Sequence, residues 1–286
     1  MSPYTLSDHA LEQMLLDDAP QGDVTTFALG IGQRPAIMHF RARGAMTVCG
    51  SEEAAAMGRL RGLTVSLHAA SGTRAEPREP LLSFRGPAAS VHLVWKTAQT
   101  LMEYLSGIAS AADEIVRAAR EGHPDCAVVC TRKTFAGTKT ASIKAILAGG
   151  ASAHRLNLSD SILLFDEHRV LNDAPPNETV ARLRRQCPER PVVVEVGTTG
   201  EALRWADAGA DVLQLEKWSP EAVAGLRDRL QGRTHPPRLA AAGGIKAGNA
   251  ANYARAGADM LVTSAPYFAP PRDVAVTIAP DTGASS

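Results

Sequence analysis

The second half of the chain repeats one pattern, in which a short apolar run is followed by a polar turn and then by apolar residues at helical spacing. Such runs are typical of strands in parallel sheets, because helices cover both faces of those sheets. They occur at residues 127–130, 161–165, 192–196, 212–215, 239–242 and 260–263. We therefore predict alternating strands and helices from about residue 107 onward, which is the pattern of an α/β barrel.

A repeated segment supports this prediction. Residues 205–213 and 253–261 share the order aromatic residue, Ala, any residue, Ala-Gly-Ala-Asp, any residue, Leu. Gly209 and Gly257 stand 48 positions apart (257 − 209), which fits two strand–helix units. In each copy a helical pattern ends at the glycine, and Ala-Asp leads into an apolar strand. Short helix-to-strand loops at this period favour a parallel barrel over a sandwich.

The first third of the chain has a different pattern. Apolar and polar residues alternate, as in half-buried strands, at residues 36–48 (with a turn at Gly44), 63–68 and 81–85. Helical spacing occurs at residues 7–16, 51–60 and 91–106. This region predicts antiparallel strands layered with helices. One more alternating segment, at residues 274–278, predicts a strand near the C-terminus.

Composition narrows the class of protein. The 30 basic and 30 acidic residues cancel, so no overall field favours nucleic acid or a membrane surface. No apolar run approaches the roughly 20 residues that span a bilayer, and four acidic residues among the first 18 are wrong for a signal peptide. Cys126 and Cys130 lack the second ligand pair of a zinc site. We expect a cytoplasmic protein with reduced thiols, and neither a nucleic-acid nor a membrane partner.

Cationic residues gather where predicted strands end. Arg132 and Lys133 follow the run at 127–130, and His154 and Arg155 form a second group on the next segment. Unpaired charge is costly to bury, so these side chains need an anionic partner such as phosphate or carboxylate. An Arg-Lys pair alone is more often a solvated basic loop, but the second group favours an anion site.

Carboxylates and glycines mark other strand ends. Glu195 and Glu216 each end an apolar run. Two carboxylates at one rim are suited to hold Mg²⁺, which would neutralise a bound pyrophosphate. Glu216 alone is equally well explained as a helix cap or as the ion-pair partner of a neighbouring lysine. Gly243 and Gly244 precede a helix, which favours phosphate binding by backbone N–H groups. Ser264, after the next strand, can donate a hydroxyl to the same phosphate. Taken singly, the Gly pair is an ordinary turn and Ser264 an ordinary cap.

These motifs, taken together in order, resemble the quinolinate phosphoribosyltransferase (nicotinate-nucleotide pyrophosphorylase) family over nearly the whole chain. The resemblance is carried by residues 22–26 (Gly-Asp-Val-Thr-Thr), 106–109, 131–134 (Thr-Arg-Lys-Thr), 149–150, 154–155, 209–211 and 243–245. Details at 142–145, 158–161 and 165–169 are most similar to the ModD branch, pyrophosphorylase-like proteins associated with molybdenum transport.

The resemblance implies an N-terminal α/β sandwich domain at residues 1–106, to which a C-terminal strand within 270–286 returns, and an open (β/α) TIM-like barrel at 107–269. It also implies a head-to-tail homodimer, or a higher oligomer built from it, in which Lys96 on the long helix reaches the partner's site. The implied reaction moves phosphoribosyl from phosphoribosyl pyrophosphate to a ring nitrogen of a small-molecule acceptor, with Mg²⁺ as cofactor.

Site roles follow from the same resemblance. One group of residues is expected to bind the substrate carboxylate and the pyrophosphate. It comprises Lys96, Arg132, Lys133, Lys139, His154 and Arg155. Lys133 and Glu195 are the expected catalytic residues, with Glu195 near the ribose. Glu195 and Glu216 are the expected metal ligands. Gly243, Gly244 and Ser264 correspond to the 5′-phosphate site.

The chain also departs from the family pattern. Phe165 stands where the family has a barrel lysine, and Lys96, preceded by Trp95, stands where it has an arginine. Ala240 and Ala242 replace a Glu and a Ser beside the Gly pair. Glu216, followed by Lys217, stands in place of an Asp. Fewer cations and an aromatic wall predict an acceptor less negative than quinolinate. Two alternatives stay open: a genuine quinolinate enzyme of NAD biosynthesis, and a non-catalytic protein that binds a phosphoribosyl ligand.

Overall fold

The computed structural model describes residues 4–283, and the chain divides into two compact units that we describe separately. The first unit takes the residues up to Asp113, residues 134–150 and the residues from Pro266 onward. The second takes residues 114–133 and 151–265. The domain boundary that we predicted between residues 106 and 107 falls inside the long helix α4, Ala88–Gly122, which contributes to both units.

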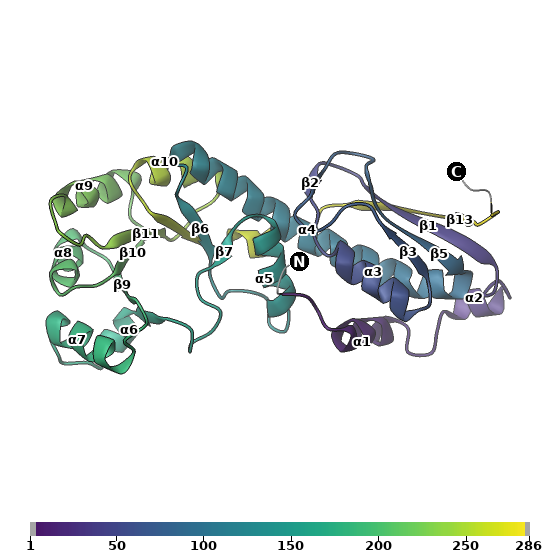
Figure 1. Ribbon diagram of the computed structural model, residues 1–286, viewed down its shortest axis with the longest axis horizontal. Coiled ribbons are helices and arrows are strands. Elements are labelled where there is room, and N and C mark those ends of the chain that lie inside the picture. The colour runs from purple at the N-terminus through teal and green to yellow at the C-terminus, as the bar shows by residue number, and fades with distance from the viewer. Residues whose placement is uncertain (1–3, 284–286) are drawn as a thin grey trace. The chain divides into compact units, whose positions relative to one another are not determined.

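The first unit joins an antiparallel sheet to several helices (Figure 1). Its elements are α1 Asp8–Asp18, α2 Val24–Ala28, β1 Pro35–Ala42, β2 Met46–Thr47, α3 Ser51–Leu60, β3 Thr64–Leu67, β4 Arg74–Ala75, β5 Pro80–Pro87, the first part of α4, α5 Lys139–Ala148 and β13 Val274–Pro280, with most of the 3₁₀ turn η1 Ala265–Phe268. The four-stranded sheet has the order β13-β1-β5-β3, and β2 pairs separately with β4.

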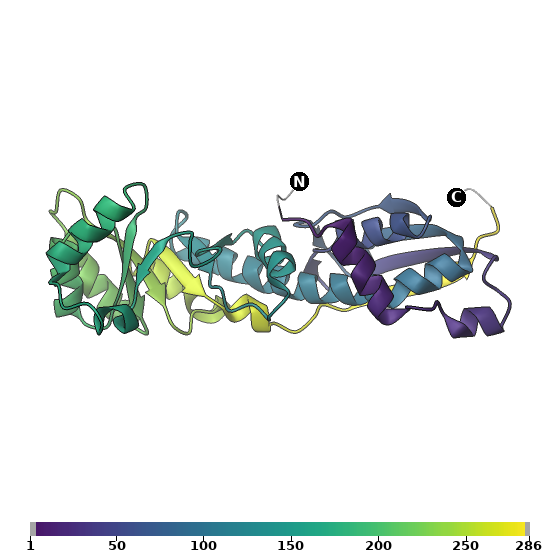
Figure 2. The same ribbon diagram turned by 90° about the horizontal axis from the view of Figure 1, so that it is seen from below.

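Alternation in β1 creates the core of this unit. Met38 and Phe40 are fully buried, and Phe40 meets the ring of Phe84 on β5 edge to face at 5.5 Å. On the other side of β1, β13 pairs antiparallel with it, with Val274 opposite Ala42, and the yellow strand follows β1 in both views (Figure 1, Figure 2). The C-terminal strand is therefore part of the first unit's sheet.

Helix α4 is longer than we predicted. The helical pattern at residues 91–106 extends to Ala88–Gly122, so the predicted end near Gly107 is wrong. Gly107 does not end the helix; it allows close packing. A side chain there would place its Cβ 2.4 Å from the carbonyl oxygen of Pro270. A glycine within a helical pattern can mark such a close approach instead of a helix end.

A buried ionic network links α3 and α5 in the first unit. The Lys144 ammonium lies 2.5 Å from Glu53 and 2.9 Å from Glu52, and the side chains of Lys144 and Glu53 are almost fully buried. Glu52 also accepts hydrogen bonds from the backbone N–H and the hydroxyl of Ser71. Burial alone would raise the pKa of Glu52, but the bonds from Ser71 and Lys144 outweigh it and lower the pKa to about 2.

The second unit is a curled parallel sheet wrapped by helices, in agreement with the predicted open barrel. Its elements are the end of α4, β6 Ala127–Cys130, β7 Ser152–Ala153, β8 Ile162–Leu164, α6 Asp166–Arg169, α7 Pro176–Gln186, β9 Val192–Val196, α8 Thr199–Asp207, β10 Val212–Glu216, α9 Pro220–Leu230, β11 Arg238–Ala242, α10 Ala247–Arg255 and β12 Met260–Thr263. The strand order is β7-β6-β12-β11-β10-β9-β8, and all six pairings are parallel. Helices α7 to α10 follow one another outside the strands (Figure 1).

The repeated Gly-Ala-Asp segments perform the same structural task twice. Asp211 accepts the backbone N–H of Val192, the first residue of β9, and binds Arg184 of α7. Asp259 accepts the N–H of Leu239 on β11 and binds Arg227 of α9. Each aspartate therefore ties the start of one strand to the neighbouring strand and to a helix, which explains why the segment recurs at two-unit spacing.

No helix within residues 4–283 has both the length and the apolar composition needed to cross a bilayer.

Candidate active site

A cavity of about 950 Å³ opens at the carboxyl ends of the second unit's strands. Nine of the eleven predicted site residues line it, namely Arg132, Lys133, His154, Arg155, Glu195, Glu216, Gly243, Gly244 and Ser264. Each of these residues lies at or just beyond the carboxyl end of a strand. Residues that are adjacent in the sequence follow the same strand. Parallel strands bring their carboxyl ends to one rim, so residues up to 132 positions apart in the chain (264 − 132) meet there.

The cations lie on one side of this cavity. Arg132 and Lys133 follow β6, and His154 and Arg155 follow its neighbour β7, whose position is fixed by a bond from His154 N–H to the Cys130 carbonyl. Within residues 4–283, neither Arg132, Lys133 nor Arg155 forms an ion pair with a carboxylate. Clustered cations without a protein partner are suited to bind an anion.

Burial and the neighbouring positive charges lower the pKa of two of these residues, His154 and Arg155. Burial lowers the pKa of His154, and the adjacent Arg155 charge lowers it further. Burial also lowers the pKa of Arg155, with a contribution from Arg132. Each cation therefore disfavours charge on its neighbours, and a bound anion would relieve that repulsion.

The carboxylates come from β9 and β10. Glu195 accepts a hydrogen bond of 2.6 Å from the side-chain amide of Gln214, its register partner on β10. Burial raises the pKa of Glu195; the Gln214 bond opposes this, while the charges of Glu216 and Glu167 reinforce it. Glu195 and Glu216 are therefore close enough to repel each other inside the cavity.

The glycine pair after β11 has a backbone geometry that favours glycine. Gly243 and Gly244 both have left-handed φ angles, 85° and 79°. A Cβ on Gly243 would lie 2.7 Å from the side chain of Lys217 and 2.9 Å from the Glu216 carboxylate. Only glycine fits between the ends of β10 and β11, and the turn leads into α10, whose first N–H groups are unsatisfied by the helix itself.

Phe165, which follows β8, forms a planar wall of the cavity. The ring of His168 stacks on it at 6.0 Å and 16° between planes, and the Arg155 guanidinium lies over it at 5.6 Å. A half-buried aromatic face with a cation over it is suited to bind another planar group.

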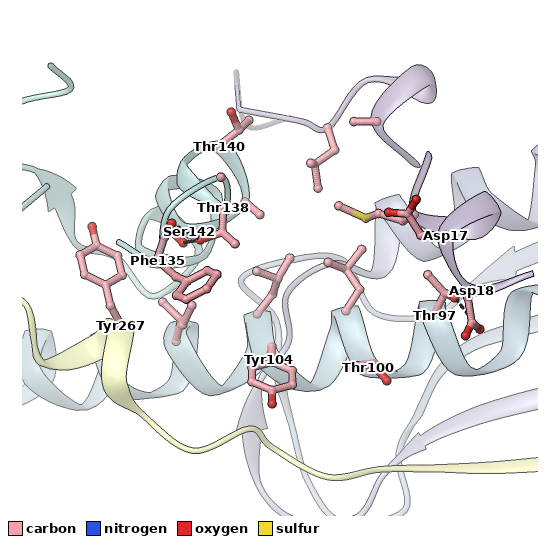
Figure 3. A pocket seen from close by; sticks show the side chains of 18 of the residues that line it. Asp17, Asp18, Thr97, Thr100, Tyr104, Phe135, Thr138, Thr140, Ser142 and Tyr267 are labelled. Carbon is pink, nitrogen blue, oxygen red and sulfur yellow. Dashed lines mark hydrogen bonds between the residues drawn. The ribbon is translucent and has the colours of Figure 1, made fainter. Parts of the chain in front are cut away.

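The other two predicted site residues lie in the first unit. Lys96 is an exposed residue of α4, with its ammonium 4.6 Å from the Trp95 ring and hydrogen-bonded to Gln99. It lines a second cavity of about 970 Å³ between α1, α4 and residues 135–142 (Figure 3). Lys139 is exposed at the start of α5. Their predicted roles in substrate binding stay predictions.

Three cavity neighbours were missed as site residues from the sequence. Gln214 interrupts the apolar run of β10, and a polar residue inside a buried strand was the signal that could have found it. Glu167 lines the cavity, and Arg169 donates to the backbone carbonyl of Glu195 while pairing with Glu201. Glu167 and Arg169 lie on α6, which is only four residues long. A pattern this short does not show which face of the helix points toward the cavity.

Comparison with known proteins assigns both parts of the chain to one family. Residues 23–106 match the Quinolinate phosphoribosyl transferase N-terminal domain, and residues 108–277 match the Quinolinate phosphoribosyl transferase C-terminal domain.

Relatives match over almost the whole length. A ModD protein of Rhodobacter capsulatus, whose name assigns it a pyrophosphorylase activity only provisionally, is 47% identical over 89% of this chain and 98% of its own. A ModD protein of Escherichia coli O157:H7, named in the same way, is 35% identical over 96% and 98%. NadC from Streptococcus pyogenes has the same fold, with a TM-score of 0.88, 24% identity and 98% of both chains covered. The nicotinate-nucleotide pyrophosphorylase from Francisella tularensis gives a TM-score of 0.87 at 19% identity, over 96% of this chain and 98% of its own.

Proposed function

Because the chain belongs to the quinolinate phosphoribosyltransferase family, we propose that it is a phosphoribosyltransferase of the pyrophosphorylase type. It transfers phosphoribosyl from phosphoribosyl pyrophosphate to a ring nitrogen of a nucleobase-like carboxylate and releases pyrophosphate. The observation that carries this proposal is one cavity lined by cations, by two carboxylates and by a glycine turn, in which Arg132, Lys133 and Arg155 have no carboxylate partner within residues 4–283. A link to molybdenum transport, implied by the resemblance to ModD proteins, belongs to the same proposal.

The cationic side of the cavity binds the leaving group in this proposal. Arg132, Lys133, His154 and Arg155 stabilise the negative charge that grows on the pyrophosphate as its bond to the ribose breaks. Arg132 and Arg155 have forked guanidinium groups that match the oxygens of phosphate or of the acceptor's carboxylate. Lys133 is a point charge, which is suited to the leaving oxygen.

The ends of the other strands hold the sugar phosphate in this proposal. Glu195 stabilises the positive charge that develops at the anomeric carbon as the ribose approaches an oxocarbenium ion. The N–H groups at the Gly243-Gly244 turn and the Ser264 hydroxyl hold the 5′-phosphate. The ribose is thereby fixed between the attacking nitrogen and the departing pyrophosphate.

A magnesium ion fits the residues present. Glu195 and Glu216 offer hard oxygen ligands whose mutual repulsion a divalent cation would offset. No group of three or more metal-binding side chains occurs within residues 4–283, so pyrophosphate and water oxygens would complete the coordination. When bound, the ion would neutralise the leaving group.

Phe165 and Lys96 shape the acceptor's identity in this proposal. The Phe165 face replaces a charged lysine by a stacking surface, so the acceptor is planar and carries less negative charge than quinolinate. Lys96 reaches the site of a second subunit in a head-to-tail homodimer, where it binds the acceptor's carboxylate.

Calorimetric titration with phosphoribosyl pyrophosphate, with and without Mg²⁺, tests the proposal. We expect binding that weakens at least about tenfold without Mg²⁺ and that Lys133→Ala abolishes, since charge-assisted contacts to phosphate are lost. Arg182→Ala, which removes an exposed cation of α7 outside the cavity, is the control and should bind normally. Acceptors are then screened by pyrophosphate release, with quinolinate first. Absence of binding in both conditions would argue against any phosphoribosyltransferase.

A further inference from the structure

Helix α6, which directly follows Phe165, is anchored by its last residue, Arg169. The Arg169 guanidinium pairs with Asp166 at the start of the same helix and with Glu201 of α8 at 2.5 Å. It also donates a hydrogen bond of 3.0 Å to the backbone carbonyl of Glu195. These contacts join α6 to α8 and β9, so they fix how the short helix is turned about its axis.

The beginning of α6 is fixed in a similar way. The Nδ1 atom of His168 accepts a hydrogen bond of 3.1 Å from the backbone N–H of Phe165, and the rings of these two residues stack. Glu167 is the remaining residue of the helix. Within residues 4–283 its side chain has neither an ion pair nor a hydrogen bond. It is exposed and lines the active-site cavity, so a ligand in the cavity can reach it.

The charge of Glu167 acts inside the cavity. Burial is the largest cause of the raised pKa of Glu195, and the charges of Glu216 and Glu167 raise it further. A shared metal ion does not account for these three carboxylates, because no group of three or more metal-binding side chains occurs in the described part of the chain. Glu167 is therefore an unpaired carboxylate close to both Glu195 and the Phe165 wall.

A planar ligand bound beside Phe165 meets groups of opposite charge. The Arg155 guanidinium, 5.6 Å from the centre of the Phe165 ring, is suited to a carboxylate. Glu167 can only accept hydrogen bonds, so it is suited to an amino group. We propose that Glu167 binds an amino group of the acceptor, which is then a planar nitrogen heterocycle bearing both an amino group and a carboxylate; this inference rests on the proposed function.

Glu167 thereby becomes a specificity-determining residue. A second carboxylate on the ligand at this position would be repelled, because two carboxylates carry like charges and neither can donate a hydrogen bond. An amino group forms a charge-assisted hydrogen bond there instead. The same side chain therefore attracts the amine and rejects a dicarboxylate such as quinolinate. This contribution differs from that of Phe165, which only presents an uncharged ring.

Matched pyridine acids test the inference without knowledge of the natural acceptor. Nicotinate is the parent compound, and 2-aminonicotinate, 4-aminonicotinate and 6-aminonicotinate each add one amino group. Calorimetry on the protein saturated with pyrophosphate and Mg²⁺ measures their affinities under conditions in which no phosphoribosyl can be transferred. We expect at least one amino compound to bind about tenfold tighter than nicotinate, because it gains a hydrogen bond to a charged group.

A variant assigns this advantage to Glu167. Glu167→Met removes the carboxylate and should reduce the advantage of the amino compound to within about twofold. Quinolinate should bind this variant about threefold tighter, because the repulsion is lost. Opposite changes for two ligands do not arise from a general disturbance of the fold. Glu178→Met, which alters an exposed glutamate of α7 outside the cavity, is the matched control and should keep the advantage.

Three outcomes contradict the inference. Equal affinity of the unaltered protein for nicotinate and all three amino compounds would overturn it, and so would absence of binding by every amino compound. An advantage that survives in Glu167→Met would assign the amino group to another residue. Failure of the unaltered protein to bind phosphoribosyl pyrophosphate would instead contradict the proposed function.

Discussion

The guanidinium of Arg155 lies over the ring of Phe165, 5.6 Å from its centroid, although the strands that carry them are the two edges of the seven-stranded sheet. Arg155 follows β7 and Phe165 follows β8, so this contact spans the open side of the barrel. The two edge strands, which do not pair with each other, therefore both contribute to this wall of the cavity.

Replacing the ring by a cation should change the acceptor preference. We expect Phe165→Lys to raise quinolinate affinity about tenfold, because an added ammonium pairs with the second carboxylate of that ligand. Phe165→Met, which removes the ring without adding charge, should give no such gain. Competition of quinolinate and of monocarboxylate analogues against a bound acceptor measures the effect. Quinolinate turnover by the unaltered protein at the rate of an authentic quinolinate enzyme would contradict this prediction.

Glu195 should matter for turnover more than for binding. Glu195→Gln keeps the shape of the side chain and removes its charge, so the developing positive charge at the anomeric carbon loses its stabilisation. We expect pyrophosphate release with the acceptor found in the screen to fall at least about 100-fold, with a much smaller change in affinity for phosphoribosyl pyrophosphate. Full turnover by Glu195→Gln would remove this residue from the mechanism.

The buried ammonium of Lys144 should be essential for stability. Lys144→Met leaves the buried Glu53 without a counter-charge, and breaking a buried pair on one side costs about 3–5 kcal/mol of unfolding free energy. Lys139→Met changes an exposed lysine of the same helix and should stay within about 0.5 kcal/mol. Urea denaturation at pH 7 compares the two variants. Equal stability of both would show that the network contributes little.

Glu52 makes the stability of the first unit depend on acid pH. Its pKa falls from 4.5 to about 2 on folding, so its contribution is complete above pH 4.5 and is lost as the pH falls from 4.5 towards 2. Glu52→Gln cannot titrate and should show a flatter loss of stability across that interval. Thermal unfolding between pH 2 and pH 6 checks the difference in slope, and parallel curves would contradict the assignment.

Asp259 should stabilise the barrel as a joint between strands. Asp259→Ala leaves the Leu239 N–H and the Arg227 guanidinium without their acceptor, which should lower the unfolding free energy by about 1–3 kcal/mol. Asp211→Ala removes the equivalent bonds to Val192 and Arg184 and should have a similar effect. Chemical denaturation of both variants tests the equivalence, and a loss confined to one of them would show that the repeat is not functionally symmetric.

Most residues of the barrel rim could be predicted from the sequence. The end of an apolar run is a local signal, and the general rule that parallel strands share one rim brings these ends together. Apolar runs that end in Arg132, Glu195 or Gly243 mark the rim, and parallel pairing gathers them. The length of α4 could not be predicted from the sequence. A glycine such as Gly107 can either end a helix or allow another backbone, here that of Pro270, to pack closely, and the sequence does not distinguish the two. The direction of the Gln214 amide and the contact between Arg155 and Phe165 depend on how far the sheet curls, which no local pattern encodes.

The pairing of β1 with β13 has a consequence for synthesis on the ribosome. Ala42 and Val274 are register partners 232 positions apart (274 − 42), and the whole second unit is translated between them. While the barrel emerges, the nascent chain therefore carries β1 with one unpaired edge, a surface that invites pairing with other chains. The barrel has all its strands before the sheet at the beginning of the chain receives its last strand.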